Sequence, residues 1–172
     1  IGLVEVGVGV IPGGGGTKEF AVRFSDEIGE GDIRINRLRE RFLTIGMAKV
    51  ATSGWEAFDL GIFRPGFDKV VVSRSRQIAE AKRKAIDLYE AGYTQPIPRT
   101  DITVMGKEGM GIVYVGANSM LSGHYISEHD ALISQKLGYV LCGGDLSERT
   151  QVSEQYLLDL EREAFLSLLG TR

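Results

Sequence analysis

The stretch GLVEVGVGVIPGGGGT, residues 2–17, decides the expected fold because alternating valines lead directly into a glycine-rich loop. Side chains of a strand alternate between its two faces, so the pattern predicts a strand with one apolar, buried face. That face carries Val4, Val6, Val8 and Val10. The opposite face carries Glu5, followed by Gly7 and Gly9, which leave open space beside the carboxylate. Such space suits a ligand, whereas the alternative interpretation of Glu5 is a solvated residue at a sheet edge.

Length and composition restrict the class of protein. The chain has 172 residues, of which 43% are hydrophobic and 25% charged, as in one globular domain. Its formal charge of -3 does not favour binding to nucleic acid or to an anionic membrane. No apolar run approaches the roughly 20 residues of a membrane span. The single cysteine, Cys142, fits a reducing compartment, so a cytoplasmic location is expected, with Cys142 as a core residue rather than a nucleophile.

Beyond residue 17 the pattern is mostly helical. Helices are expected over 17–25, 32–50, 54–60, 74–91, 110–122, 127–141 and 152–169, and a short strand over 70–72. Ser53 and Ser127 each precede an acidic residue three positions later, which predicts helix N-caps at both serines. The helix over 74–91 should bury a stripe made by Ile78, Ala81, Ala85 and Leu88. The helix over 152–169 has a wider apolar arc, which indicates packing on two sides or against another chain.

Neither common nucleotide-binding motif fits the glycine loop. A G-x-G-x-x-G fingerprint starting at Gly7 would need glycine at position 12, where the chain has Pro12, which also lacks an N–H. A phosphate-binding loop ending in Gly-Lys-Ser/Thr has its last residues in another order, since here Lys18 follows Thr17.

The other titratable residues favour structural interpretations. His124 and His129 are five positions apart, which does not place two metal ligands on one helix face. Glu161 and Glu163 are expected at the surface with Arg162. A basic stretch from Arg74 to Lys84 is expected to be a solvated helix face, with a phosphate-bearing ligand or partner as the alternative.

Three segments carry a resemblance to a known family. The run VE at 4–5 followed by IPGGGGT at 11–17, the segment SGWEAFDLGIF at 53–63 and the segment LEREAF at 160–165 resemble the crotonase (enoyl-CoA hydratase/isomerase) superfamily. Phe63 departs from the valine usual in the second segment. Residues 152–168 look closest to the hydratase end of bifunctional bacterial 3-hydroxyacyl-CoA dehydrogenases.

The resemblance implies an α/β fold, the C-terminal part of a crotonase ββα spiral, with this chain mostly α-helical. Residues 1–92 would end the core spiral, 93–150 would be a family-specific expansion, and 151–172 a C-terminal oligomerisation helix. By motif position, Glu5 and Gly13 would be catalytic. The expected substrate-binding residues are Gly7, Gly9, Pro12 and Gly14.

The function implied is that of a fragment of a fatty-acid β-oxidation enzyme that hydrates 2-enoyl-CoA to 3-hydroxyacyl-CoA. The parent protein would also carry an NAD-dependent 3-hydroxyacyl-CoA dehydrogenase activity, whereas no cofactor or metal is expected in this fragment beyond the coenzyme A thioester substrate. The family's second carboxylate and its oxyanion hole would lie upstream, so the isolated piece is expected to be inactive. A homo-oligomer formed through the C-terminal helices is the expected partner arrangement.

Two alternatives remain open from the sequence. The first is another acyl-CoA enzyme of the same superfamily, such as an isomerase, thioesterase or decarboxylase. The second is a non-catalytic oligomerisation module in which Glu5 has no chemical role.

Overall fold

The computed structural model describes residues 1–171, and the chain divides into two compact units. The first unit joins Ile1–Ala51 to Pro98–Arg172, and the second is Thr52–Ile97. None of the helices in the described residues is both long and apolar enough to cross a membrane.

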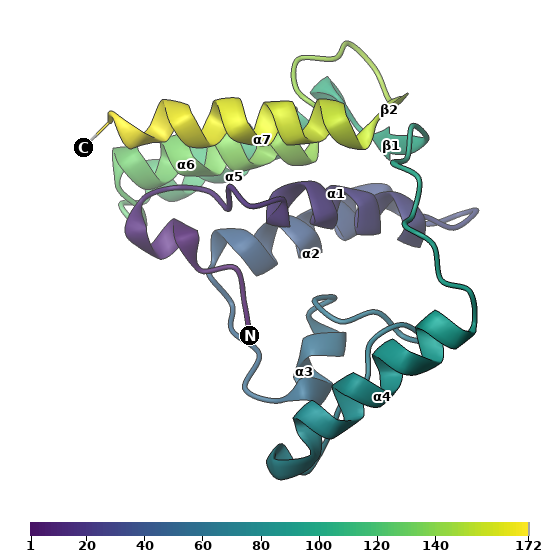
Figure 1. The fold of residues 1–172 in the computed structure, drawn as a ribbon. Helices are drawn as coiled ribbons and strands as arrows, with labels where there is room; N and C mark the ends of the chain where they lie inside the picture. Colours follow the sequence, from purple (N-terminus) through teal and green to yellow (C-terminus); the bar gives the residue numbers. More distant parts are fainter. Residues whose placement is uncertain (172) are drawn as a thin grey trace. The chain divides into compact units, whose positions relative to one another are not determined.

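The first unit is a helical layer with one small sheet (Figure 1). Its helices are α1 (Gly16–Glu27), α2 (Arg34–Gly46), α5 (Lys107–Ser122), α6 (Glu128–Leu141) and α7 (Glu154–Leu169). Helix α6 is central, because α1, α2, α5 and α7 all contact it. Strands β1 (Ile102–Val104) and β2 (Thr150–Val152) pair antiparallel, with Thr103 opposite Gln151. Completely buried apolar side chains hold these helices together, among them Phe24, Ile45, Leu137 and Leu157.

The strand expected over residues 2–11 is wrong. The segment forms a short 3₁₀ helix, Glu5–Val8, in which the carbonyl of Val4 accepts a hydrogen bond from Gly7 N–H (2.9 Å). Within the described residues, this segment pairs with another part of the chain through one isolated β-bridge, between Gly2 and Val50. A strand without a paired neighbour leaves its backbone polar groups unsatisfied, and the positive φ of Gly9 (96°) ends any extended run. The valine face expected to be buried is therefore partly open, with Val8 72% exposed.

The second unit contains α3 (Gly54–Asp59), a 3₁₀ turn (Arg74–Arg76) and α4 (Gln77–Glu90). The N-cap at Ser53 is confirmed, since Ser53 Oγ accepts a hydrogen bond from Glu56 N–H (3.1 Å). The Glu56 carboxylate bonds instead to the backbone N–H of Thr52 (2.6 Å), one residue earlier than a capping box requires.

Two expectations fail in this second unit. No strand forms over 70–72. The apolar stripe of α4 is not buried: Ile78 is 84% and Leu88 37% exposed. The unit has too few residues to cover an entire helix face, because small units bury a smaller share of their surface.

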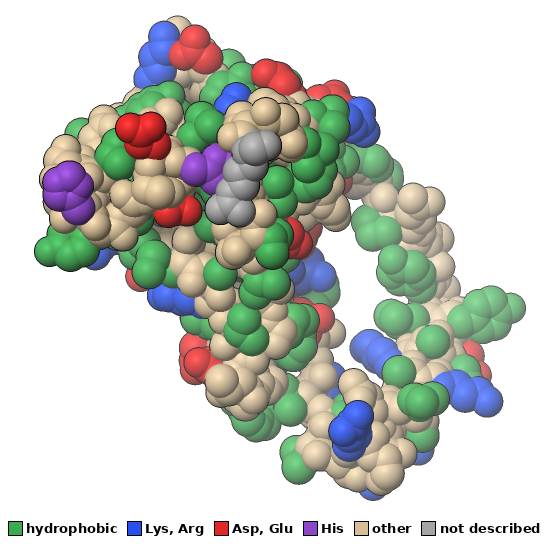
Figure 2. Space-filling view, turned by 90° about the vertical axis from the view of Figure 1, so that its left-hand side faces the viewer, with side chains coloured by type: hydrophobic (Ala, Val, Ile, Leu, Met, Phe, Trp, Pro, Cys, Tyr) green, Lys and Arg blue, Asp and Glu red, His purple; other side chains and the backbone are tan. Residues whose placement is uncertain are grey.

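Charged side chains of both signs are interspersed on the face drawn in Figure 2. This mixture agrees with the small formal charge of -3. The ion pairs of the chain include short-range ones, such as Lys18 with Glu19 (3.2 Å) and Arg37 with Glu40 (3.6 Å), along one helix each. The Arg37–Glu40 pair is exposed and contributes little to stability, so the more buried contacts described below matter more.

Candidate functional site

The glycine loop forms a tight entry into α1. Pro12 is buried, Gly13 and Gly14 are exposed, and Gly15 is the N-cap residue with a φ of 91°. Residues other than glycine adopt that conformation at a cost, so Gly15 is required by the turn itself. The first backbone N–H groups of α1 have no partner within the helix, and Gly15 has no side chain to cap them.

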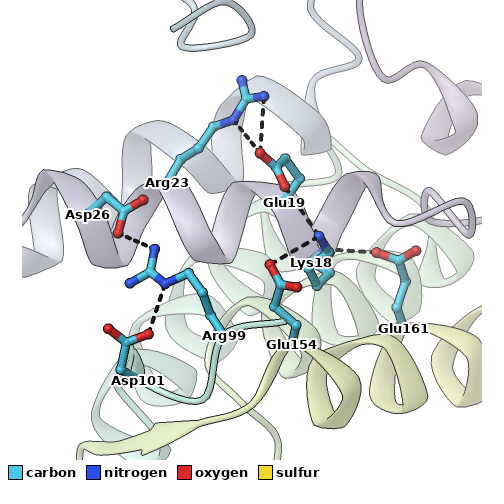
Figure 3. A network of polar contacts seen from close by, with 8 residues as sticks. All are labelled: Lys18, Glu19, Arg23, Asp26, Arg99, Asp101, Glu154 and Glu161. Carbon is cyan, nitrogen blue, oxygen red and sulfur yellow. Dashed lines mark hydrogen bonds and ion pairs between the residues drawn. The ribbon is translucent and has the colours of Figure 1, made fainter. Parts of the chain in front are cut away.

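The cap comes from α7, through Glu161 (Figure 3). The Glu161 carboxylate accepts hydrogen bonds from the backbone N–H of Gly15 (2.5 Å) and of Lys18 (2.8 Å). Glu161 is 1% exposed, so its expected place at the surface is wrong. Burial raises the pKa of Glu161 above its ordinary range, while the backbone N–H groups of Lys18, Gly15 and Thr17 oppose that rise.

A sequence signal for the buried Glu161 did exist. Leu157, Glu161, Ala164 and Leu168 follow one another at spacings of four, three and four, and all four side chains are buried. A carboxylate inside an apolar stripe indicates a buried polar partner, because an unpaired buried charge is costly. The identity of that partner had no local signal, since Lys18 lies 143 residues earlier.

The occupied cap limits what the glycine loop can bind. A helix N-terminus is a ready site for a phosphate, but a protein carboxylate already takes the Gly15 and Lys18 N–H groups. Because Pro12 also removes one N–H donor, the loop does not fit the pyrophosphate of NAD.

Gly13 is tightly packed although it is exposed. A Cβ built on Gly13 would lie 2.7 Å from Cδ2 of Phe165 on α7. At Gly14, by contrast, such a Cβ would meet nothing within 4 Å. Gly13 is thus explained by close contact with Phe165, and α7 uses the second side of its apolar arc to cover the glycine loop.

Glu5 has an unusual environment for a carboxylate. Its Oε2 atom is buried and has no hydrogen-bond partner among the residues that the structure describes. A Cβ on the nearby Gly7 would meet nothing within 4 Å, so no steric contact explains that glycine. No hydrogen bond in the described part of the chain joins the Glu5 carboxylate to residues 12–16. Among the expected site residues, Glu5 is the one with an unused buried acceptor.

His129 takes part in this region, which the sequence did not indicate. The Gly9 carbonyl accepts a hydrogen bond from His129 Nε2 (3.0 Å), which ties α6 to the segment that carries Glu5. The expectation that His129 is only a surface or capping residue is therefore incomplete. Among the described residues, His, Cys, Asp and Glu side chains do not gather into groups of three or more suited to a metal.

A second polar network fixes the chain before β1 to α1 (Figure 3). The Arg99 guanidinium pairs with Asp26 (2.5 Å) and with Asp101 (2.8 Å). Asp101 and Asp26 together raise the pKa of Arg99, and Arg99 lowers the pKa of Asp101. On α1, Lys18 also pairs with Glu154 (3.8 Å), the first residue of α7.

The comparisons with known proteins identify one relative. Over 170 residues, 99% of the chain, the sequence is 42% identical to a protein of Bacillus subtilis (strain 168) named "Probable 3-hydroxyacyl-CoA dehydrogenase". The chain spans 21% of the length of that relative. No protein-family model matches the sequence, and no solved structure gives a significant match.

This relative corrects the expected function. The resemblance to a bacterial 3-hydroxyacyl-CoA dehydrogenase is confirmed at the level of sequence similarity. The hydratase activity is not: the relative is named for a dehydrogenase, and nothing in its name supports a hydratase or another lyase. The expectation of an enzyme that hydrates 2-enoyl-CoA is therefore wrong.

Proposed function

We propose that the chain is a segment of a larger enzyme that oxidises 3-hydroxyacyl-CoA thioesters with NAD. The observation that carries this proposal is the 42% identity over 170 residues to a protein named as a probable 3-hydroxyacyl-CoA dehydrogenase. The activity is proposed for the whole protein, because the chain spans 21% of the relative. In that reaction a hydride and a proton leave the 3-hydroxyl carbon and oxygen, and NAD accepts the hydride.

Within such an enzyme, this segment would contact the acyl-CoA rather than NAD. The capped glycine loop argues against a dinucleotide site here, as does Pro12. The unused Oε2 of Glu5 supports a hydrogen bond from a ligand donor, such as a hydroxyl or a pantetheine amide N–H. Gly7, Gly9, Pro12, Gly13 and Gly14 would form the backbone around that contact.

For the architecture we propose that the chain is part of a crotonase-type fold. This proposal does not depend on which reaction the full-length protein catalyses. Its support is the spacing of Glu5 and the glycine loop described above. A crystal structure of the full-length protein tests it, since the spiral requires parallel strands stacked before residue 1 of this chain.

Association of copies through α7 is also proposed. Leu166 and Leu169 are 57% and 58% exposed on that helix, and exposed apolar side chains favour an interface. Light scattering of the full-length protein checks this: Leu166→Glu with Leu169→Glu should lower the particle mass, and an unchanged mass contradicts it.

The dehydrogenase activity is tested with the full-length protein, 3-hydroxybutyryl-CoA and NAD, following NADH formation. We expect NADH to form only when both substrates are present. Folded protein that forms no NADH with short-, medium- or long-chain 3-hydroxyacyl-CoA contradicts the proposal.

The role of Glu5 is tested in the same assay. Glu5→Gln should raise KM for the acyl-CoA by about tenfold and leave KM for NAD unchanged, because it alters one charged acceptor. Glu163→Gln, an exposed change on α7, is the matched control and should leave both values unchanged. A Glu5→Gln variant with the KM of the unmodified protein excludes Glu5 from the site.

A further inference from the structure

A small polar pocket lies at the far end of α1 from the glycine loop. Its volume is about 230 Å³, and its lining residues are Ser25, Ile28, Arg34, Thr103 and Arg149. They come from the end of α1, the start of α2, the middle of β1 and the residue before β2. Four separate segments thus place two arginines, a serine and a threonine around one space.

The acids beside this pocket are already paired. Asp26 pairs with Arg99 (2.5 Å), and Glu27 pairs with Arg41. In contrast, neither Arg34 nor Arg149 has an ion pair in the part of the chain that the structure describes. The pocket therefore holds two positive charges that no protein carboxylate balances.

Arg34 has an unmet hydrogen-bond donor. Its Nε atom is buried and has no partner among the described residues. A buried donor without an acceptor is costly, so a native protein rarely keeps one unless a ligand or water completes it. Helix α2 begins at Arg34 without a side-chain cap, which adds the positive end of a helix dipole.

The hydroxyl of Ser25 keeps a proton that it can donate. Ser25 Oγ accepts a hydrogen bond from the backbone N–H of Thr103 (2.9 Å). Because a serine hydroxyl carries one proton and this oxygen is used as an acceptor, its O–H remains available to a further acceptor. The pocket then offers donors from arginine and from serine, the combination that phosphate oxygens use.

A structural alternative is that the two arginines neutralise the carbonyls at the end of α1. The described residues contain no hydrogen bond from either guanidinium to those carbonyls. The alternative also leaves the buried Nε of Arg34 without an acceptor.

We propose that Arg34, Arg149, Ser25 and Thr103 form a binding site for a phosphate group. Phosphate is favoured over a carboxylate because its oxygens can bond two guanidinium groups and a hydroxyl together. The group could be free phosphate or the phosphomonoester of coenzyme A, and the second source rests on the proposed function.

The test is calorimetric titration of the full-length protein with inorganic phosphate at low ionic strength. We expect binding that weakens as salt is added. Arg34→Ala and Arg149→Ala should each weaken it by about tenfold or more, because each removes a charged hydrogen-bond donor. Arg39→Ala removes an exposed charge from α2 outside the pocket and should change the affinity by less than about twofold.

Arg149 is exposed, so Arg149→Ala should leave the melting temperature unchanged. If Arg34→Ala does not fold, the affinity of Arg149→Ala for phosphate still tests the proposal. No binding at tens of millimolar phosphate overturns the proposal. Equal binding by the unmodified protein and by folded Arg149→Ala overturns it as well.

Titrations with coenzyme A and 3′-dephospho-coenzyme A distinguish the sources. Tighter binding of coenzyme A, with the difference lost in Arg149→Ala, assigns the pocket to its 3′-phosphate. Equal binding of the two compounds, with phosphate still bound, assigns it to free phosphate. Failure of the dehydrogenase assay does not affect the phosphate titration, so the two proposals fail separately.

Discussion

Glu161 on α7 and Gly15 before α1 are joined by a hydrogen bond of 2.5 Å, although they lie 146 residues apart in the chain. Glu161 thereby provides the cap that the glycine loop cannot provide for itself. The same carboxylate bonds Lys18 N–H, so one side chain satisfies two donors at the start of α1. This contact links α1 and α7, the first and last helices of the first unit. Its loss should therefore lower the stability of the whole unit.

Glu161→Ala should lower the free energy of unfolding by about 2–4 kcal/mol, because it leaves two partly buried N–H groups without acceptors. Urea denaturation followed by circular dichroism measures the change. Glu163→Ala, two residues along the same helix and exposed, is the matched control and should change stability by less than about 0.5 kcal/mol. Equal stability of the two variants contradicts a capping role for Glu161.

The pH dependence of stability should also report on Glu161. Burial raises its pKa above the ordinary value of 4.5, so the folded protein keeps this proton to a higher pH than the unfolded chain does. The contribution of Glu161 to stability is therefore complete below about pH 4.5 and declines as the pH rises through the folded-state pKa. Subtracting the stability curve of Glu161→Gln from that of the unmodified protein isolates this decline. A difference that grows with pH in this window contradicts the prediction.

The helices were predictable where the signal was local. Ser127 and Asp130 form the expected cap, with Asp130 N–H bonded to Ser127 Oγ (3.1 Å), and α6 ends at Leu141 as expected. The helix expected over 110–122 also forms, as α5, and the alternative strand at 112–115 does not. Caps and periodicity depend on residues three or four positions apart, which a sequence displays directly.

The expectations that failed depend on contacts between distant segments. Alternating valines predict a strand only if a partner strand exists, and in the described residues Gly2 finds one bridge, to Val50. Without that pairing, the segment closes local bonds as a 3₁₀ helix. Gly13 also depends on a distant segment, since a Cβ built there would meet the ring of Phe165 on α7, while its expected catalytic role stays a prediction. No local pattern contains that information.

Cys142 should be unreactive in the folded protein. Burial raises its pKa to about 12, and its side chain is fully buried at the end of α6. Because only the thiolate reacts readily, labelling by a disulfide reagent at neutral pH should be at least about a thousandfold slower than in the urea-unfolded chain. Rapid labelling of the folded protein contradicts this burial.

Gly13 and Phe165 should be energetically coupled. Gly13→Ala would bring a methyl group within 2.7 Å of the Phe165 ring, so it should destabilise the protein by about 1–3 kcal/mol. Gly14→Ala places its methyl group in open space and serves as the control, with a change of less than about 0.5 kcal/mol. Phe165→Leu removes the ring atoms, so it should reduce the effect of Gly13→Ala, and a double-mutant cycle measures the coupling. Additive effects of the two substitutions would show that the contact with Phe165 does not require glycine at position 13. The space beside Gly13 would then be explained better by a bound ligand.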